Sequence, residues 1–304
     1  MNALTAGFDL QARLDELHRL VDEALERALP ADDAWPATIH RAVRYSLFAG
    51  GKRIRPLLTL AAGEAVGGAR DEIMPLACAV EMVHTYSLIH DDLPAMDDDD
   101  LRRGKPTSHK VFGEAIAILA GDALLTRAFH LLADVPEGWD VARLRRRLQA
   151  AALLGEAGGT RGLIGGQVED LESEGRQVAP EALERLHRAK TGALLAACVR
   201  GGALLGGAGP GDLERLGRYA SAVGLAFQIV DDVLDATEGD AQLGKTAGKD
   251  AAAHKATYVS IHGLARAREL AQGLLAEALA ALSPLGPRGE LLAGLARLIV
   301  ERRA

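Results

Sequence analysis

The sequence predicts an all-α protein, and composition is the first observation that points to this class. The chain has 304 residues, of which 48% are hydrophobic but only 4% aromatic, so its core must be built mainly from aliphatic side chains. Ala and Leu favour helices, whereas the β-branched and aromatic residues that favour strands are scarce outside short runs. The second observation is periodicity: apolar residues recur three or four positions apart along much of the chain, as one face of a helix requires.

The expected helices are separated by residues that begin or end helices. Gly50 and Gly51 end the second helix, and Pro56 lies in the first turn of the third, where the missing N–H of proline costs nothing. Pro94 cannot continue the fourth helix, so the acidic run after it should form a loop. In chain order, we expect helices over residues 10–30, 39–48, from 56 onward, 74–92, 113–132, 144–164, 180–205, 213–234, 257–282 and 290–301.

The chain shows no sign of a boundary between domains. No Ser/Gly-rich linker separates the expected helices, and the length fits one large domain. Residues 237–250 are rich in Gly, Lys and Asp and predict a loop. We therefore expect a single all-helical domain over residues 1–304.

Charge and cysteine content argue against several classes of protein. The formal net charge is −7, which argues against nucleic-acid binding, since a phosphate backbone requires a basic face. Cys78 and Cys198 lie in apolar helical sequence, which predicts buried free thiols. No basic region followed by an apolar run opens the chain. The longest apolar stretch, 193–209, is interrupted by Arg200 and glycines and is short for a bilayer span, so we expect a cytoplasmic protein without a membrane span.

The most informative feature is a pair of acidic motifs, over residues 91–97 and 231–235. Each motif follows an apolar helical stretch. Carboxylates this close together repel each other unless a cation lies between them. Two such clusters facing one cavity would bind hard divalent cations. The pair therefore predicts a magnesium site that holds a diphosphate.

The second motif has the simpler geometry. Asp231 and Asp235 are four residues apart on one helix face, and Gln228 lies three residues earlier on the same face. Like charges at this spacing destabilise a bare helix, so the arrangement requires a compensating ligand. A solvated helix end would be the simpler interpretation of this motif alone.

In the first motif, Asp91 and Asp92 end a helix, where negative charge opposes the helix dipole. Asp97 lies beyond Pro94, and His84 lies seven residues before Asp91 on nearly the same face. The glycine and terminal glutamate of an EF-hand loop are missing. An acidic surface loop would explain this motif alone, but the two motifs together favour a metal site.

Basic residues that suit phosphate lie near both motifs. Gly51, Lys52 and Arg55 form a glycine-rich corner before a helix, where backbone amides and the helix dipole favour an anion. Arg102 and Arg103 directly follow the acidic loop. Further cations lie in an apolar helix (Lys190-Thr191) and after the second motif (Gly244-Lys245-Thr246 and Gly248-Lys249-Asp250). The last segment lacks the glycine spacing and preceding strand of a P-loop, so we interpret it as a basic lid.

In their order along the chain, these motifs resemble those of the trans-isoprenyl diphosphate synthases, most closely the bacterial farnesyl diphosphate synthase type. The resemblance covers residues 50–258 and includes Gly-Gly-Gln-Val-Glu-Asp at 165–170. It implies an isoprenoid-synthase bundle of about ten core helices around a central cavity, and a homodimer. It also implies head-to-tail condensation of isopentenyl diphosphate with dimethylallyl and geranyl diphosphate to make farnesyl diphosphate.

The resemblance implies a role for each site residue. About three Mg2+ ions, or Mn2+ in their place, would be bound by Asp91, Asp92, Asp97, Asp231 and Asp235. The allylic diphosphate would contact Arg102, Lys190, Gln228, Lys245 and Lys255, and Thr191 is a further substrate-binding candidate. Isopentenyl diphosphate would contact Gly51, Lys52, Arg55, His84 and Arg103. The residues expected to contribute most directly to catalysis are Asp91, Asp92, Asp97, Arg102, Lys190 and Lys245.

The resemblance also bears on product length and closure. In this family, residues four or five positions before the first Asp form the cavity floor. Here these are Ser87 and Tyr86, of which Tyr86 lies roughly 7.5 Å below the metal site along the helix. Helix geometry does not decide between them, but the family pattern, with its insertion at 94–95, favours Tyr86 and a farnesyl product. Closure would use the 244–250 loop and the basic tail at Arg302 and Arg303.

Three alternatives remain open. A geranylgeranyl or geranyl diphosphate synthase would differ mainly in cavity depth. A terpene cyclase shares the first motif, but the intact second motif and the Lys52–Arg55 pair argue against it. A non-catalytic regulatory subunit would be expected to lose motif aspartates, and this chain retains them all. Small isoprenoid diphosphates are the expected binding partners in the leading interpretation.

Overall fold

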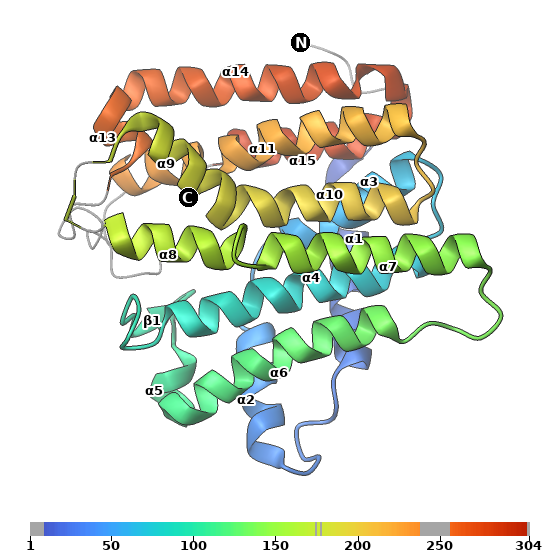
Figure 1. Cartoon of the computed structure of the whole chain (residues 1–304), viewed down its shortest axis with the longest axis vertical. Coiled ribbons are helices and arrows are strands. Elements are labelled where there is room, and N and C mark those ends of the chain that lie inside the picture. The colour runs from blue at the N-terminus through green and yellow to red at the C-terminus, as the bar shows by residue number, and fades with distance from the viewer. Residues whose placement is uncertain (1–8, 174, 177, 238–255, 303–304) are drawn as a thin grey trace.

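The computed structural model is all-α, as the sequence predicts (Figure 1). It describes residues 9–173, 175–176, 178–237 and 256–302. A two-stranded hairpin, β1 (Leu101–Arg102) and β2 (Lys105–Pro106), follows the fourth helix. The helices are α1 (Leu10–Ala28), α2 (Ala37–Leu47), α3 (Ile54–Ala65), α4 (Arg70–Asp91), α5 (Ser108–Phe112), α6 (Glu114–Ala133), α7 (Val141–Gly158), α8 (Leu163–Ser173), α9 (Pro180–His187), α10 (Ala193–Leu205), α11 (Pro210–Thr237), α13 (Tyr258–His262), α14 (Leu264–Leu282) and α15 (Glu290–Val300).

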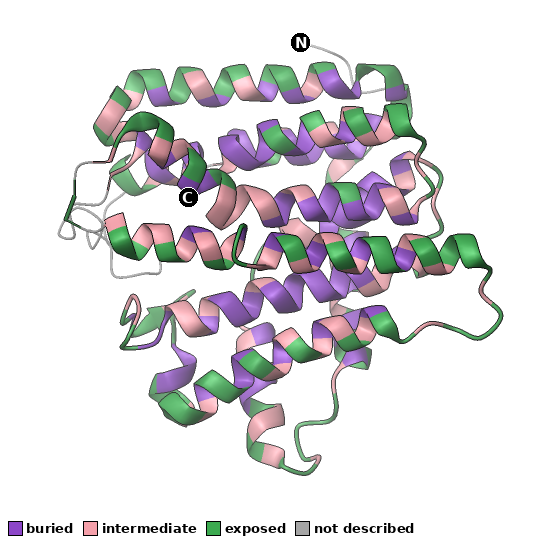
Figure 2. Cartoon of the chain, in the orientation of Figure 1, coloured by how far each residue is buried: buried purple, intermediate pink, exposed green. Residues whose placement is uncertain are grey.

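The helices lie side by side, and their directions bring the two acidic motifs to one end of the bundle. α4 packs against α3 and α6, while α10 packs against α3, α7 and α11. α14 packs along α11. In Figure 1, α4 and α11 both end at the side of the bundle that carries the hairpin and α13. The buried residues concentrate along α4, α10 and α11 (Figure 2), so the motif-bearing helices run through the core.

A buried ion pair fixes the corner between α2 and α3. Arg53 adopts a left-handed conformation, with φ of +48°, and is 4% exposed. Its guanidinium donates to Glu81 of α4 (2.8 Å), to the carbonyl of Leu47 (2.8 Å) and to Asp22 of α1 (3.0 Å). Breaking a buried ion pair by removing one partner costs about 3–5 kcal/mol. These contacts therefore fix the backbone of the glycine-rich corner, in which Arg53 lies between Lys52 and Arg55.

Several expectations about individual elements are confirmed. The first helix ends at Ala28, shortly before Pro30, and Pro56 lies in the first turn of α3. Cys78 and Cys198 are buried free thiols.

Other boundaries differ from those predicted, mostly near glycines. The helix expected over 144–164 is two helices, because α7 ends at Gly158 and α8 begins at Leu163. The helix expected over 257–282 breaks at Gly263, where φ is +79°. The helix expected over 180–205 is interrupted by a π-helical segment, Arg188–Gly192. Glycine is tolerated within helical patterns, so its presence alone does not reveal where a helix breaks.

Two further differences concern the region around the first motif and the basic loop. The fourth helix begins at Arg70, earlier than expected, and contains Pro75. The hairpin after the acidic loop was not predicted. Residues 238–250 of the expected basic loop lie outside the described residues.

Within the described part of the chain, one helix passes a length and composition test for a membrane span. This helix is α6, with 20 residues and a mean hydropathy of 1.5, and 33% of its most apolar window is buried. α6 also packs against α4. One such helix is weak evidence for a span, because the core helix of a globular protein can have the same length and composition.

Candidate active site

The first acidic motif folds back onto the end of α4. Asp91 is the last residue of the helix. Beyond Pro94, the backbone N–H of Asp97 donates to the carbonyl of Asp91 (2.8 Å), and that of Asp98 donates to the carbonyl of Leu93 (3.1 Å). The turn places Asp97 close enough to Asp91 for its charge to raise the pKa of Asp91. The backbone turn therefore brings Asp97 back toward Asp91, which the sequence alone did not predict.

Electrostatics at the first motif favour a bound cation. Burial raises the pKa of Asp91 to about 6, although the Lys190 charge lowers it. Burial also raises the pKa of Asp92, against the lowering effect of a hydrogen bond from Arg102. A nearby positive charge stabilises the charged form of such carboxylates. The donors are all carboxylate oxygens, which are the ligands that Mg2+ prefers, so the residues fit this ion.

The second acidic motif is divided between two faces of α11. Asp231 and Asp235 share one face, as their spacing requires. Asp232 is 7% exposed, and its carboxylate accepts hydrogen bonds from the backbone N–H of Tyr258 (2.8 Å) and from Gln228 Nε2 (3.4 Å). Burial raises the pKa of Asp232 to about 7. Asp232 thus anchors α13 to α11 and lies apart from the pair predicted to bind metal.

The side chain of Arg302 contacts the second acidic motif. Its guanidinium donates to the carboxylate of Asp231 and to the carbonyl of Phe227 (3.3 Å). It also lies 4.4 Å from the centroid of the Phe227 ring. The structure therefore places a protein cation beside one of the predicted metal ligands. Arg303, the other residue of the expected basic tail, lies outside the described residues.

The π-helical segment contributes two polar side chains between the motifs. Lys190 Nζ lies 2.7 Å from Asp170 Oδ2. Thr191 Oγ1 donates to Gln228 Oε1 on α11 (2.9 Å). The Lys190 charge also lowers the pKa of Asp91 on α4. Lys190 and Thr191 therefore connect the helices that carry the two acidic motifs.

Close backbone packing accompanies this segment. A Cβ atom at Gly166 of α8 would overlap the backbone nitrogen of Lys190. Only glycine lets α8 approach so closely, which explains one glycine of the Gly-Gly-Gln-Val-Glu-Asp motif. Single-turn π-helical segments occur frequently at functional sites.

The glycine-rich corner brings together three residues predicted to bind isopentenyl diphosphate. Gly51 has φ of +127°, and a Cβ atom there would lie 2.5 Å from Arg103 Nη1. The Arg103 guanidinium also donates to the carbonyl of Gly50. Lys52 is exposed beside them. Gly51 is thus required both for its backbone conformation and for the approach of Arg103.

Arg55 and His84 extend this basic region toward the core. Arg55 Nε is buried and has no hydrogen-bond partner within the described residues, and its guanidinium lies 6.0 Å from the Phe227 ring centroid. Burial, followed by the charges of Arg55 and Arg103, lowers the pKa of His84 well below its ordinary value. His84 is therefore neutral at pH 7. A buried guanidinium N–H calls for an acceptor, and an anionic ligand would provide one.

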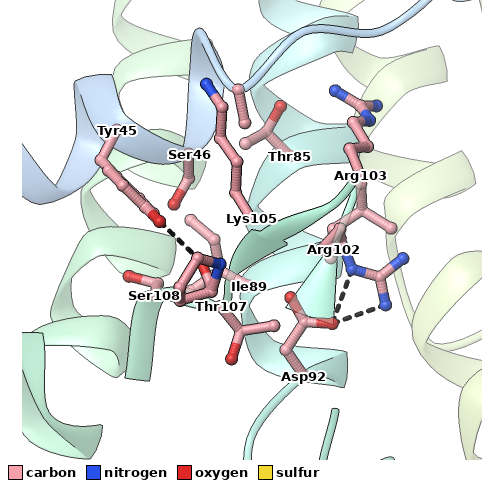
Figure 3. Close-up of a pocket in the computed structure, with 13 residues that line it drawn as sticks. Tyr45, Ser46, Thr85, Ile89, Asp92, Arg102, Arg103, Lys105, Thr107 and Ser108 are labelled. Atoms are coloured by element: carbon pink, nitrogen blue, oxygen red, sulfur yellow. Dashed lines mark hydrogen bonds and ion pairs between the residues drawn. The ribbon is translucent and has the colours of Figure 1, made fainter. Parts of the chain in front are cut away.

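Arg102 contacts a motif carboxylate directly. Its Nε and Nη2 lie 2.6 Å and 2.5 Å from the same oxygen of Asp92. Figure 3 shows Arg102 turned toward Asp92, while Arg103 points away from it. Both arginines line a small cavity of about 30 Å³ between α2, α4 and the hairpin. The structure thus places Arg102 at the first motif, and its predicted contact with the allylic diphosphate stays a prediction.

The two candidates for the cavity floor differ in orientation. Tyr86 is 6% exposed, and its ring meets that of His90 edge to face, with 5.7 Å between centroids. His90 in turn donates to the carbonyl of Ile118 on α6 (3.0 Å). Ser87 instead donates to the carbonyl of His84 in its own helix (2.8 Å). Tyr86 therefore adds bulk on the side of α4 next to α6, and we keep it as the candidate for the floor.

The burial of His187, at the end of α9, leads us to expect that the stability of the protein depends on pH. It is 6% exposed, and burial lowers its pKa to about 4. In the unfolded chain its pKa would be about 6.5, so the unfolded state binds the proton first as pH falls through this window. Stability should therefore be lost between about pH 6.5 and about pH 4, by up to about 3 kcal/mol from this group. In His187→Phe, the Tm should fall less over that range than in the unchanged protein; equal slopes would contradict this assignment.

Sequence reasoning did not single out two residues of the Gly-Gly-Gln-Val-Glu-Asp motif, and two of the predicted site residues lie outside the described residues. Asp170, the partner of Lys190, belongs to the Gly-Gly-Gln-Val-Glu-Asp motif, but no role had been assigned to it. The side-chain amide of Gln167, in the same motif, is buried without a hydrogen-bond partner within the described residues. The motif itself was the signal that could have identified both. Lys245 and Lys255 lie outside the described residues.

Comparison with known sequences identifies close relatives. Residues 36–283 match the family model described as polyprenyl synthetase. The large subunit 1 of a heterodimeric chloroplastic geranylgeranyl pyrophosphate synthase from Arabidopsis thaliana is 52% identical over 276 residues, which cover 90% of this chain and 74% of the relative. A dimethylallyltranstransferase from Fischerella ambigua (strain UTEX 1903) is 50% identical over 298 residues, covering 98% and 85%.

Solved structures show the same fold. An FPP/GFPP synthase from Zymomonas mobilis matches with a TM-score of 0.85 at 38% identity, covering 96% of this chain and 99% of that one. A geranyltransferase from Helicobacter pylori, complexed with magnesium and isoprenyl diphosphate, matches with a TM-score of 0.83 at 32% identity, covering 99% and 98%. The family match includes both acidic motifs, the π-helical segment and the basic corner. The chain therefore belongs to the polyprenyl synthetase family and is a trans-isoprenyl diphosphate synthase.

Proposed function

We propose that this prenyltransferase elongates allylic diphosphates with isopentenyl diphosphate as far as geranylgeranyl diphosphate. The observation that carries the proposed chemistry is the arrangement of two acidic motifs, connected by Lys190 and Thr191, next to a separate basic corner. This arrangement offers one site for a metal-bound diphosphate and a second for a diphosphate bound by cations alone. The C20 product is supported by the similarity to the Arabidopsis enzyme, which is named a geranylgeranyl pyrophosphate synthase.

The acidic side of the site would activate the allylic substrate. Asp91, Asp92, Asp97, Asp231 and Asp235 would hold Mg2+, which when bound neutralises charge on the departing diphosphate. Lys190 is a fixed cation between the motifs, held by its ion pair with Asp170 (2.7 Å). Because it is already in position, it stabilises the negative charge that develops as the allylic C–O bond breaks.

The basic side would bind and orient isopentenyl diphosphate. Lys52, Arg55 and Arg103 supply positive charge, and Gly51 allows the close approach of Arg103. Neutral His84 can donate a hydrogen bond without adding to the charge. Holding both substrates in one geometry avoids much of the entropy cost of their encounter.

For carbon–carbon bond formation, the protein then has to exclude water and hold the two substrates in position. The Thr191 hydroxyl and the Gln228 amide, hydrogen-bonded to each other, present uncharged dipoles between the helices that carry the two acidic motifs. Exclusion of water protects the carbocation from hydrolysis. We assign the final proton to the released diphosphate, which is the strongest base that the reaction itself supplies.

A farnesyl product is the second candidate, and Tyr86 favours it. The bulky, buried ring of Tyr86 lies five residues before Asp91, where a floor would stop the growing chain roughly 7.5 Å from the metal site. The similarity to geranylgeranyl synthases and the presence of Tyr86 therefore point to different products. The sequence pattern predicted farnesyl diphosphate, whereas the relatives favour the longer alternative.

Product analysis distinguishes these possibilities. The protein would be incubated with Mg2+, isopentenyl diphosphate and, separately, dimethylallyl, geranyl or farnesyl diphosphate. Extension of farnesyl diphosphate to a C20 product would support the main proposal, and a stop at C15 would establish the farnesyl alternative. Mg2+-dependent binding without condensation would contradict both and favour a cyclase or a regulatory subunit.

Tyr86→Ala is expected to lengthen the product, because it removes a buried ring from the side of α4 next to α6. The matched control is Ser87→Ala, which removes only a hydroxyl that bonds to its own helix and should leave the chain length unchanged. Products would be resolved by chromatography after dephosphorylation. The same distribution in Tyr86→Ala and the unchanged protein would remove Tyr86 from the floor.

We propose a homodimer formed through α6. Ile118 and Leu119 of α6 are 43% and 53% exposed, and Leu148 of α7 is 71% exposed. A groove of about 660 Å³ between α2 and α6, lined in part by Ile39, Ile116 and Leu119, adds to this apolar surface. Exposed apolar surface of this kind marks interaction sites. The Arabidopsis relative is named a subunit of a heterodimer, so a different partner is the competing proposal.

Leu119→Lys should convert the dimer into a monomer, since it places a charge in the proposed apolar interface. Light scattering after size-exclusion chromatography measures the mass. The control is Leu298→Lys on α15, which changes a leucine of similar exposure (40%) outside this surface. A dimer that persists in Leu119→Lys, or an unchanged protein that is already a monomer, would contradict the proposed interface.

A cytoplasmic location stays a prediction; the Arabidopsis relative is described as chloroplastic.

A further inference from the structure

A second cluster of side chains suited to metal binding lies beside the active site. Asp98, Asp100 and His109 each bring a ligand atom within 4.8 Å of those of the other two. The aspartates belong to the loop between α4 and β1, and His109 belongs to α5. None of these three residues is among those that we expect to bind the Mg2+ of the reaction. The cluster therefore has no role in the proposed mechanism.

Thr107 holds one nitrogen of the His109 ring. Thr107 Oγ1 donates its only proton to the carbonyl of Asp99 (2.7 Å) and also lies 3.1 Å from His109 Nδ1. Nδ1 must therefore carry a proton and donate it to Thr107. The other ring nitrogen, Nε2, is buried and has no hydrogen-bond partner within the described residues.

A histidine ring held in this way can bind a metal ion. Metal-binding histidines commonly donate one ring N–H to an oxygen acceptor and coordinate the metal through the other nitrogen. His109 is 7% exposed, so water does not readily satisfy this nitrogen. The orphaned nitrogen belongs to a ring that is itself part of the cluster, and a buried nitrogen without a partner calls for a ligand.

Backbone hydrogen bonds hold the acidic part of the cluster in position. The N–H of Asp98 donates to the carbonyl of Leu93 (3.1 Å), and the N–H of Thr107 donates to the carbonyl of Asp100 (3.0 Å). Asp98 has φ of +46°, an unfavourable conformation for a non-glycine residue. Such conformations persist where the surroundings enforce them, often at ligand sites. These hydrogen bonds thus fix the loop that carries Asp98 and Asp100.

A protein cation already lies next to this cluster. Lys110 Nζ lies 2.7 Å from Asp100 Oδ1, and this hydrogen bond raises the pKa of Lys110. The Lys110 side chain is 43% exposed, so it can swing into solvent at little cost. It is therefore a displaceable competitor for a metal ion.

We propose that Asp98, Asp100 and His109 bind a divalent ion of the zinc class, separate from the Mg2+ of the reaction. One imidazole nitrogen with two carboxylate oxygens suits Zn2+, whereas Mg2+ prefers oxygen ligands alone. Three protein ligands leave a position for water. The ion would join the loop of the first acidic motif to α5. This inference does not depend on the product of the enzyme.

The first test measures bound zinc by equilibrium dialysis of the full chain against Zn2+ in a large excess of Mg2+. We expect the unchanged protein and Asp91→Asn to retain an ion that Asp100→Asn and His109→Gln lose. Asp100 is exposed, so its substitution should leave the fold intact, which circular dichroism checks. Equal retention in Asp100→Asn and the unchanged protein would overturn the proposal, as would loss of the ion in Asp91→Asn.

A second test substitutes Thr107, which orients His109, and Lys110, which competes with the metal ion for Asp100. Thr107→Val should weaken zinc binding by about 10–100-fold, the usual effect of removing a residue that orients a metal ligand. Thr107→Ser keeps the hydroxyl and should restore the affinity. Lys110→Met removes the competing cation from an exposed position and should tighten binding. If Lys110→Met leaves the affinity unchanged or weakens it, the ion does not bind at Asp100 and the proposal fails.

Discussion

Asp91→Asn is expected to lower kcat by about 10³-fold, because the loss of metal binding at the leaving diphosphate removes several kcal/mol of transition-state stabilisation. Asn has nearly the same shape but carries no charge, and Asp91 is the carboxylate at the end of α4 on which the first motif folds back. Turnover should be measured over a range of Mg2+ concentrations, together with the circular dichroism spectrum.

The control for this prediction lies on the same helix. Asp71→Asn makes the same substitution at the exposed start of α4, far from the motif, and should leave kcat close to that of the unchanged protein. A fall of less than tenfold in Asp91→Asn would show that Asp91 does not hold a catalytic metal ion.

Lys190→Met is expected to lower kcat by about 10²–10³-fold, the usual cost of removing one fixed donor that stabilises developing charge. Lys190 is held 2.7 Å from Asp170 and influences Asp91 across the site, so its charge acts where the diphosphate departs. Single-turnover release of diphosphate would separate this effect from product dissociation. Lys190→Arg should recover part of the rate, because it keeps the charge with a different geometry.

Arg185→Met is the matched control for Lys190→Met. Arg185 lies on α9, the helix before the π-helical segment, and also forms an ion pair, with Glu169 (3.1 Å), but it is 67% exposed. Exposed pairs contribute little to stability, and this one lies outside the proposed machinery. Equal losses in the two variants would mean that Lys190 acts through general electrostatics and not by direct contact.

Local rules were sufficient to predict the fold class and the first acidic motif. Helical periodicity and a core of small aliphatic residues predict an all-α protein. Pro94 cannot continue a helix, and the acidic run does leave the helix, which ends at Asp91. In the second motif, helix geometry alone places Asp231 and Asp235 on one face.

Features that depend on tertiary contacts were missed. Residues 188–192, Arg-Ala-Lys-Thr-Gly, lie between two helical stretches and contain no proline, so their sequence does not distinguish a π-helical segment from an α-helix. Its position depends on the close approach of Gly166 to the backbone of Lys190. Arg102 could have contacted either a substrate or a carboxylate, and only the folded chain shows that it lies on Asp92. A cation in a sequence does not reveal which anion it will meet.

The contact between Arg302 and Asp231 has a practical consequence for producing the protein. Any polypeptide added after Arg302 would leave the fold next to the second acidic motif, because that arginine already lies on Phe227 and Asp231. A purification tag fused there, and a polyhistidine tag above all, would bring its own metal-binding groups to the catalytic end of the bundle. A tag placed ahead of α1 avoids this contact, so recombinant enzyme for metal-binding measurements is best tagged at that end.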